Sequence, residues 1–314
     1  MRALEHENRP SRLSFVVVTD SFDTIAPLVE HLVAQTIAAE IELVAACPST
    51  IAAPERSVEP LAFKSVLHPL LPLGEARAAA VRASSAPVVA VGETHSFPAP
   101  DWAERMLRAH DGPWAAVVPA IENANPEGGV ASWSSFLIDY GHFMVGGTGH
   151  EVSEPPPYNV VFKREVLLSF GRQLGDLLEP GSALGQELRG QGHHSYYEPR
   201  ARLDHLNVAT RRAWLHERFL GGRLLGARRR GRWPLARTMA YVAGSPLIPL
   251  VRLLRTRNAL TAATHAGHLP PHTGLAVMLA CVLWGFGELV GYVAGGGGAE
   301  GEMVEYELHK ARYL

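Results

Sequence analysis

The tripeptide Glu93-Thr94-His95 places two metal-ligating side chains after a short apolar run, Pro87 to Gly92. That run has the length and composition of a buried strand. A carboxylate and an imidazole two positions apart can bind the same divalent cation, and a cation at the end of a strand can hold a diphosphate. The start of a solvated loop is the alternative interpretation, because polar residues commonly follow a buried strand.

The elements that must position this tripeptide alternate between strands and helices. Four short apolar runs have the character of buried strands: 13–19, 41–46, 87–91 and 114–119. In three other segments the apolar residues recur at helical spacing: 25–33, 75–84 and 101–109. Asp23 or Thr24 is expected to cap the first helix. The proline-rich stretch up to Pro72 shows no regular pattern. This alternation predicts an α/β fold with a doubly wound, mostly parallel sheet.

The next part of the chain is less regular. Residues 122–157 resemble a long loop that contains one aromatic helix, 133–140. A strand-like run at 158–164, a helix from Glu165, a short helix at 184–190 and a strand at 194–197 follow. Residues 202–205 are predicted to form a polar turn.

The carboxyl end of the first predicted strand carries Thr19 and Asp20, at the edge where open α/β sheets bind ligands. Both are therefore positioned to contact a bound ligand. A helix-capping role is the alternative for Asp20.

Composition narrows the functional classes. The 314 residues carry a formal net charge of −2, which argues against a nucleic-acid-binding protein because such domains usually have a basic surplus. Cys47 and Cys281 are the only cysteines, a number that favours a reducing compartment. The first residues, Met1 to Glu7, lack the apolar core of a signal peptide. We therefore expect the first domain to lie in the cytoplasm.

The last third of the chain has a membrane-associated character. Residues 275–294 contain one charge, Glu288, and a helix of this length approaches the ~30 Å thickness of the hydrocarbon core. The run 239–254 is broken by two prolines and predicts an interfacial element. A helical pair buried against the rest of the protein is the alternative for both runs. Three glycines in the second run would allow close helix packing: Gly285, Gly287 and Gly291. A basic cluster of six arginines begins before the first run: Arg223, Arg228, Arg229, Arg230, Arg232 and Arg237.

The order of these features resembles a family 2 glycosyltransferase of the GT-A fold, of the membrane-associated bacterial type, over about residues 14–218. The residues that carry the resemblance follow one another at the spacing of that family: Gln35, Glu93, His95, Asn159, Lys163, Arg164, Glu179, Gly192, Pro199 and His205. The family's metal motif is Asp-x-Asp, and this chain has a Glu-x-His variant of it.

The resemblance implies specific roles. Glu93, His95 and the late His205 would bind Mn²⁺ or Mg²⁺, and imidazole suits Mn²⁺ better. Glu179 would take the proton from the acceptor hydroxyl, although Pro180 stands where the family has aspartate.

Donor-side and acceptor-side contacts also follow from the resemblance. Thr19, Asp20, Glu93 and Asn159 would contact the nucleotide sugar or line the acceptor side. The family's aspartate after the second strand has no counterpart in residues 45–49, so the nucleotide base is not indicated.

Each of these residues also has an ordinary structural interpretation. His205 could be a surface or hydrogen-bonded core histidine, Glu179 a structural carboxylate, and Asn159 a polar turn residue.

The function implied is transfer of a sugar from a nucleoside diphosphate donor to a hydroxyl of a lipid-linked or glycan acceptor at the cytoplasmic membrane face, with inversion. The expected organisation is a tail (1–12), a catalytic domain (13–218), a basic interfacial segment (219–257), a membrane helix region (258–298) and a second tail (299–314). A catalytically weak, membrane-docked scaffold is the alternative. A nucleotidyltransferase fits less well, because the turn after the first strand has neither glycine nor lysine.

Overall fold

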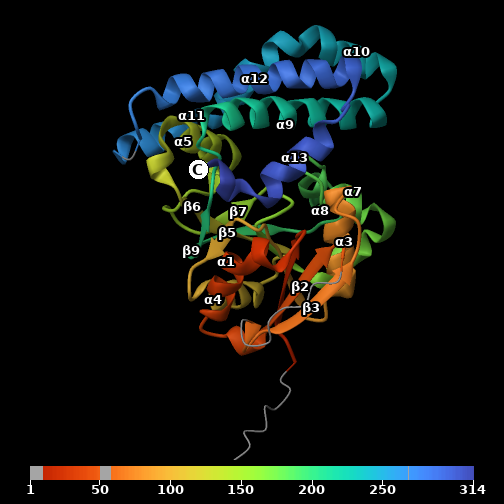
Figure 1. Cartoon of the computed structure of the whole chain (residues 1–314), viewed down its shortest axis with the longest axis vertical. Coiled ribbons are helices and arrows are strands. Elements are labelled where there is room, and N and C mark those ends of the chain that lie inside the picture. The colour runs from red at the N-terminus through yellow and green to blue at the C-terminus, as the bar shows by residue number, and fades with distance from the viewer. Residues whose placement is uncertain (1–9, 50–57, 268) are drawn as a thin grey trace, which may run out of the picture. The chain divides into compact units, whose positions relative to one another are not determined.

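The computed structural model describes residues 10–49, 58–267 and 269–314. Its contacts divide the chain into two compact units, which are described separately (Figure 1). The first unit comprises residues 1–119 and 148–201, and the second comprises residues 120–147 and 202–314. An α/β fold with C-terminal helices, as predicted from the sequence, is confirmed.

The described strands form one nine-stranded mixed sheet in the order β3-β2-β1-β4-β8-β6-β9-β5, with β7 paired to β9. The first four strands run parallel, whereas β8 is antiparallel to both β4 and β6. The strands are β1 (Leu13–Val18), β2 (Ile41–Cys47), β3 (Ala62–Leu67), β4 (Val88–Val91), β5 (Ser96–Pro98), β6 (Ala116–Asn123), β7 (His150–Val152), β8 (Val160–Lys163) and β9 (Ser195–His205).

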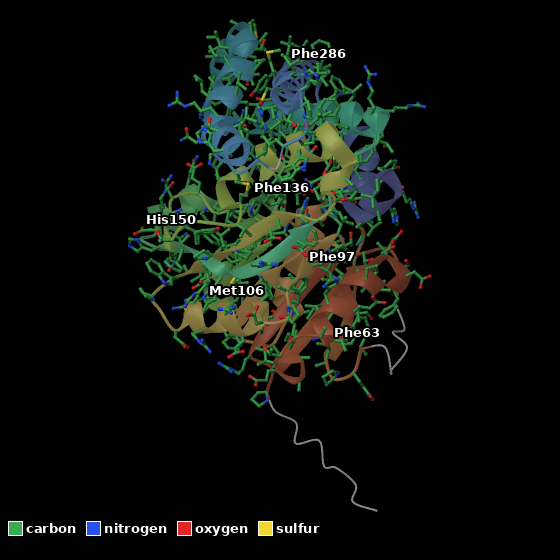
Figure 2. The ribbon with its side chains drawn as sticks, turned by 90° about the vertical axis from the view of Figure 1, so that its left-hand side faces the viewer. Phe63, Phe97, Met106, Phe136, His150 and Phe286 are labelled. Atoms are coloured by element: carbon green, nitrogen blue, oxygen red, sulfur yellow. The ribbon has the colours of Figure 1, made fainter. Side chains whose placement is uncertain are left out.

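Two parts of the sheet differ from the prediction. The irregular stretch before Pro72 contains the edge strand β3, on which Figure 2 labels Phe63. Its polar residues Lys64 and Ser65 interrupt the apolar run that would have indicated a strand. Residues 202–205 are not a turn but the end of the long strand β9, in which exposed Arg202 alternates with buried Leu203. One face of such a strand is exposed, and charged residues on that face suggest a turn when only the sequence is considered.

The helices of the first unit pack on this sheet, and α3 lies against β1 and β2. Ser21 caps α1 by accepting a hydrogen bond from the Thr24 amide at 3.3 Å, so the prediction that Asp23 or Thr24 caps it is wrong. The helix begins earlier than its apolar spacing indicates. The helices are α1 (Phe22–Val33), α3 (Leu73–Ala83), α4 (Trp102–His110), α6 (Arg164–Ser169), α7 (Leu174–Leu177) and α8 (Leu184–Gly190).

His110 at the end of α4 makes the first unit sensitive to acid. Its Nε2 donates to the Val161 carbonyl at 3.1 Å, and burial lowers its pKa to about 4. Since the unfolded pKa is about 6.5, the unfolded chain binds more protons as the pH falls from 6.5 to 4. Stability is therefore expected to fall over this range, by about 3 kcal/mol at its acid end.

Urea unfolding at a series of pH values measures this loss. His110→Gln keeps a donor for the carbonyl and should flatten the pH dependence, whereas His265→Gln, at an exposed position of the second unit, should leave it unchanged. An equal slope in the His110 variant and the original protein would contradict the assignment.

The second unit is mostly helical. Its helices are α5 (Gly129–Asp139), α9 (Arg211–Arg232), α10 (Leu235–Gly244), α11 (Ile248–His265), α12 (Thr273–Ala294) and α13 (Ala299–Leu308). Helices α9 and α12 lie side by side and run in the same direction (Figure 1).

Glycines allow α9 and α12 to touch backbone to backbone. A Cβ atom at Gly287 or Gly291 would collide with the α9 backbone, and one at Gly222 or Gly226 would collide with the α12 backbone. A Cβ atom at Gly285 would lie 2.9 Å from ring carbons of Pro249 in α11. The prediction that these α12 glycines let other helices approach closely is confirmed.

Among the described residues, α12 is the one helix long and apolar enough to cross a membrane, with a mean hydropathy of 1.8. Its single charge, Glu288, is buried within the second unit and pairs with Arg229 at 2.9 Å. The Trp284 indole also donates to Glu288, at 2.9 Å. Glu288 therefore faces other residues of the second unit.

Candidate functional site

The Glu93-Thr94-His95 tripeptide lies at the carboxyl end of β4, next to the carboxyl end of β1. The Gly92 amide donates to the Val16 carbonyl at 2.9 Å, and a Cβ at Gly92 would collide with the Phe15 ring. The three residues after it are 5%, 5% and 2% exposed. The alternative of a solvated loop start is thus wrong, because this turn is part of the core.

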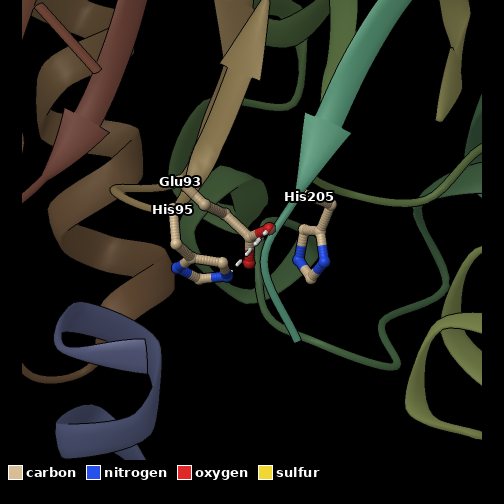
Figure 3. A group of neighbouring side chains, drawn as sticks. All are labelled: Glu93, His95 and His205. Atoms are coloured by element: carbon tan, nitrogen blue, oxygen red, sulfur yellow. Dashed lines mark ion pairs between the residues drawn. The ribbon is translucent and has the colours of Figure 1, made fainter. Parts of the chain in front are cut away.

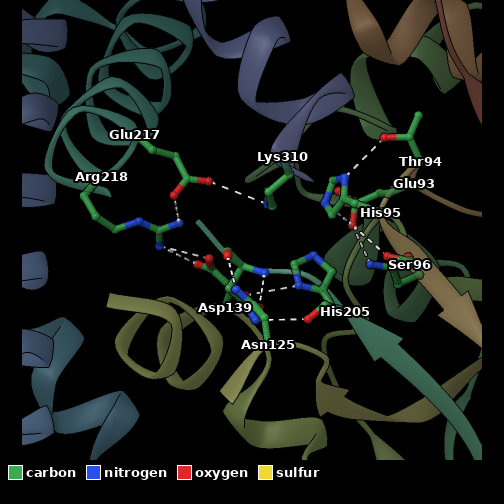
Figure 4. Close-up of polar contacts among 12 residues, drawn as sticks. Glu93, Thr94, His95, Ser96, Asn125, Asp139, His205, Glu217, Arg218 and Lys310 are labelled. Carbon is green, nitrogen blue, oxygen red and sulfur yellow. Dashed lines mark hydrogen bonds and ion pairs between the residues drawn. The ribbon is translucent and has the colours of Figure 1, made fainter. Parts of the chain in front are cut away.

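The carboxylate of Glu93 gathers three polar groups of the first unit around one oxygen. Asn159 Nδ2 donates to Glu93 Oε2 at 2.5 Å, Ser96 Oγ donates at 3.4 Å, and His95 Nε2 lies 3.6 Å away (Figures 3 and 4). Thr94 Oγ1 lies 3.4 Å from the other ring nitrogen of His95. The tripeptide therefore forms a buried carboxylate–imidazole pair with a fixed orientation.

Asn159 holds this pair from the neighbouring strand. It precedes β8, its amide donates to the Val91 carbonyl at 2.6 Å, and its φ of 56° is the left-handed conformation that asparagine tolerates. Asn159 is thus a turn residue by its backbone and a partner of Glu93 by its side chain. The interpretation of Asn159 as a turn residue is confirmed, and its contact with a nucleotide sugar or an acceptor stays a prediction.

His205 ends β9 in the second unit and is 2% exposed. Its Nδ1 lies 3.2 Å from Asn207 Oδ1. Its ring centroid lies 4.6 Å from that of Tyr140. A donor at Nδ1 leaves the ligating lone pair on Nε2. His205 is therefore buried and hydrogen-bonded, with a defined ring orientation.

Three asparagines of the second unit fix the turn after His205. Asn125 and Asn207 exchange hydrogen bonds of 2.7 and 2.8 Å, and Asn207 Nδ2 donates to Asn123 Oδ1 at 3.0 Å. The sequence interpretation missed this support. All three asparagines lie within two residues of the end of a strand, β6 or β9, and this position in the sequence could have indicated the support.

Glu179 lies against the N-terminus of α3 in the first unit. Its Oε1 accepts the Gly74 amide at 2.8 Å, and the residue is 6% exposed. Gly74 is needed there, because a Cβ at this position would lie 2.7 Å from Glu179 Cγ. The carboxylate therefore has a structural contact, and its catalytic role stays a prediction.

Thr19 and Asp20 follow β1 at the same sheet edge. Thr19 is fully buried and its Oγ1 donates to the Ser21 carbonyl at 2.8 Å, while Asp20 Oδ1 accepts from Thr24 Oγ1 at 2.6 Å. Both contacts shape the start of α1. Nucleotide contact by these residues stays a prediction.

The residues that could hold a metal are now defined. Within the first unit, Glu93 and His95 offer a carboxylate oxygen and an imidazole nitrogen. The imidazole of His205, in the second unit, stays a predicted third ligand. One carboxylate and two imidazoles suit Mn²⁺, Zn²⁺ or Fe²⁺ better than Mg²⁺. These side chains fit a divalent cation by the chemistry of their donor atoms.

No protein-family model and no curated protein matches this chain. Among solved structures, it is similar to GalNAc-T7 with UDP, GalNAc and Mn²⁺ at 14% identity, covering 64% of this chain and 44% of that one, with a TM-score of 0.47. It is also similar to S. aureus TarS at 12% identity, covering 68% of this chain and 39% of that one, with a TM-score of 0.42. The chain therefore spans less than half the length of either protein.

Proposed function

We propose that the protein is a metal-assisted glycosyltransferase of the GT-A type that transfers a sugar from a nucleoside diphosphate donor to a hydroxyl. The observation that carries the proposal is the buried Glu93–His95 pair, held by Asn159 at the carboxyl end of a parallel strand. Open α/β sheets bind ligands at that edge. A buried carboxylate beside an imidazole there is suited to bind a cation that neutralises a diphosphate.

In this proposal His205 would be the third metal ligand beside Glu93 and His95, as the sequence resemblance implies. The metal, when bound, would act as a Lewis acid toward the leaving diphosphate. Asn159 would keep the Glu93 carboxylate turned toward the metal, and Asn207 would keep His205 in the ligating tautomer. Thr19 and Asp20, at the same edge of the sheet, would contact the nucleotide.

Glu179 would act as the general base. As the acceptor oxygen attacks the anomeric carbon and the bond to the diphosphate breaks, the hydroxyl proton would pass to the Glu179 carboxylate. This displacement inverts the anomeric centre. The acceptor would be a lipid-linked or glycan hydroxyl at the cytoplasmic face of the membrane.

Thermal unfolding with a panel of nucleoside diphosphates, with and without Mn²⁺, tests the proposal. A ligand that binds only the native state at a hundred times its Kd stabilises it by about 2.7 kcal/mol. We expect one nucleotide to stabilise the protein more when Mn²⁺ is present. His205→Ala should remove the Mn²⁺-dependent part, while His265→Ala, at an exposed position, should not. No stabilisation by any nucleotide would overturn the proposed function.

Glu179→Gln separates the catalytic from the structural role of this residue. Glutamine keeps an oxygen that can accept the Gly74 amide but cannot take a proton. We expect kcat to fall about 10²-fold or more, with a Tm close to that of the original protein. A lowered Tm with kcat unchanged would show that Glu179 acts only through α3.

A further inference from the structure

The second unit exposes an extended apolar surface on α10, η5 (Ser245–Leu247), α11 and α12. Of fifteen large apolar side chains that are exposed among the described residues, thirteen lie here, and we call them the apolar helical surface. They are Leu235, Met239, Tyr241, Leu247, Leu250, Val251, Leu254, Leu275, Met278, Leu279, Val282, Phe286 and Val293. A surface of this kind marks a membrane or protein interaction site.

The exposed residues of α12 form one stripe along the helix. Five of its residues recur at spacings of three, four and seven and are 47% or more exposed: Leu275, Met278, Val282, Phe286 and Val293 (Figure 2 labels Phe286). The opposite side of the helix carries the glycines that contact α9. Helix α12 thus has one face for protein and one apolar face without a partner in the second unit.

The charges around this surface have one sign. Residues 228–299 contain eight arginines and one acidic residue, Glu288, which is buried and paired with Arg229. Arg230, Arg232, Arg237, Arg255 and Arg257 are exposed. An apolar surface bordered by basic side chains is complementary to a bilayer with anionic headgroups.

Aromatic side chains lie at the border between the arginines and the apolar surface. The Arg237 guanidinium lies 4.1 Å from the centre of the Trp233 ring, and Tyr241 packs on the same ring with centroids 4.7 Å apart. Tryptophan and tyrosine are enriched at the level of lipid headgroups. This border therefore has the composition of a membrane–water interface.

Helix packing argues against a transmembrane orientation of α12. Helix α9 runs beside α12 in backbone contact, so a spanning α12 would carry α9 into the bilayer with it. Helix α9 contains eight arginines, and four of them, Arg211, Arg212, Arg230 and Arg232, are exposed. Exposed arginines in the hydrocarbon core are costly.

We propose that α12 does not cross the membrane and that the apolar helical surface lies in the plane of an anionic bilayer, inserted from one side. The proposal deepens the membrane association stated under the proposed function and rests on it for its biological meaning. It identifies the occupant of the surface as anionic lipid. Vesicle binding needs neither nucleotide nor metal, so its outcome is independent of the nucleotide test.

Co-sedimentation of the full-length protein with vesicles tests the proposal. We expect binding to phosphatidylcholine vesicles that contain phosphatidylglycerol, and weaker binding to phosphatidylcholine alone. Met278→Glu with Phe286→Glu should weaken binding about tenfold or more, because two charges enter the apolar stripe. Gln173→Glu with Gln186→Glu adds the same charge at exposed positions of the first unit and should change binding little.

Labelling of single cysteines then separates insertion from spanning. Cys47 and Cys281 are replaced by alanine, and a cysteine is placed at Gly274, before the apolar stripe, or at Gly301, in α13 after it. An impermeant maleimide added outside sealed vesicles should label both positions. Protection of one of the two would show that α12 spans the bilayer and would overturn the proposal.

Two further outcomes would also overturn it. One is the absence of binding to either kind of vesicle. The other is self-association in sedimentation velocity that Met278→Glu with Phe286→Glu abolishes, without vesicle binding, which would assign the surface to a second copy of the chain.

Discussion

Replacing Glu93 with glutamine is expected to abolish Mn²⁺ binding and to lower kcat/KM for sugar transfer by about 10²–10³-fold. The glutamine amide has nearly the volume of the carboxylate but no charge to offer the cation. Its oxygen can still accept the Asn159 hydrogen bond that Glu93 Oε2 accepts at 2.5 Å. The loss should therefore fall on metal and substrate binding more than on the fold.

Titration calorimetry with Mn²⁺ and a nucleotide-sugar transfer assay measure the two effects. Glu30→Gln is the matched control, because it makes the same change at an exposed position of α1. A Glu93→Gln protein that keeps the Mn²⁺ affinity of the original would show that this carboxylate is not a metal ligand.

The same assay addresses the alternative of a membrane-docked scaffold without activity. The chain differs from the family that its sequence resembles at three places: the metal motif, the residue after Glu179 and the residues after β2. Measurable transfer or nucleotide-sugar hydrolysis that disappears in Glu93→Ala and in Glu179→Ala would exclude the scaffold. Mn²⁺ binding without any turnover would favour it.

The buried parallel strands could be predicted from sequence because both faces of β1, β2 and β4 are covered, so their residues are almost uniformly apolar. The edge strand β3 could not be predicted in this way. Its side chains are exposed or half-buried, and Lys64 and Ser65 carry no pattern that separates them from a loop.

The candidate site was predictable in its ligating residue types but not in its supporting contacts. Glu93 and His95 are close in sequence, so their pairing follows from local spacing alone. The contacts of Glu93 with Asn159 and of Glu179 with Gly74 join residues 66 and 105 positions apart. Such contacts depend on strand order, and the antiparallel insertion of β8 beside β4 was not predicted.

Replacing Arg218 with methionine is expected to cost the largest part of the stability of the second unit. Arg218 Nη1 lies 2.9 Å from Asp139 Oδ2, and Arg218 Nη2 lies 3.0 Å from Glu217 Oε2 (Figure 4). The Arg218 side chain is 5% exposed. Removing one partner of a buried ion pair leaves the other charges uncompensated, at about 3–5 kcal/mol. Total stabilities of about 5–15 kcal/mol make this a severe loss.

Chemical denaturation followed by circular dichroism measures the effect of Arg218→Met. The control is Arg212→Met, an exposed arginine six positions earlier on α9, for which a change below about 0.5 kcal/mol is expected. Equal losses in the two variants would show that the buried cluster contributes no more than a surface charge.

The pH dependence of this loss identifies its cause. Burial raises the pKa of Glu217, but Arg218 and Lys310 more than offset it and hold the pKa below its ordinary value. Glu217 therefore contributes stability that is present above its unfolded pKa and disappears as the pH falls through the folded pKa. In Arg218→Met the positive charge that lowers this pKa is gone, so burial dominates and the folded pKa of Glu217 rises. Protonation of Glu217 at low pH then removes the uncompensated buried charge of the variant. The unfolded pKa is the same in both proteins, so the difference in their unfolding free energies should be largest at neutral pH and shrink as the pH falls from the raised folded pKa of the variant to the lowered one of the original protein. A difference that stays constant with pH would mean that lost packing around Trp284, and not the uncompensated Glu217 charge, destabilises the variant.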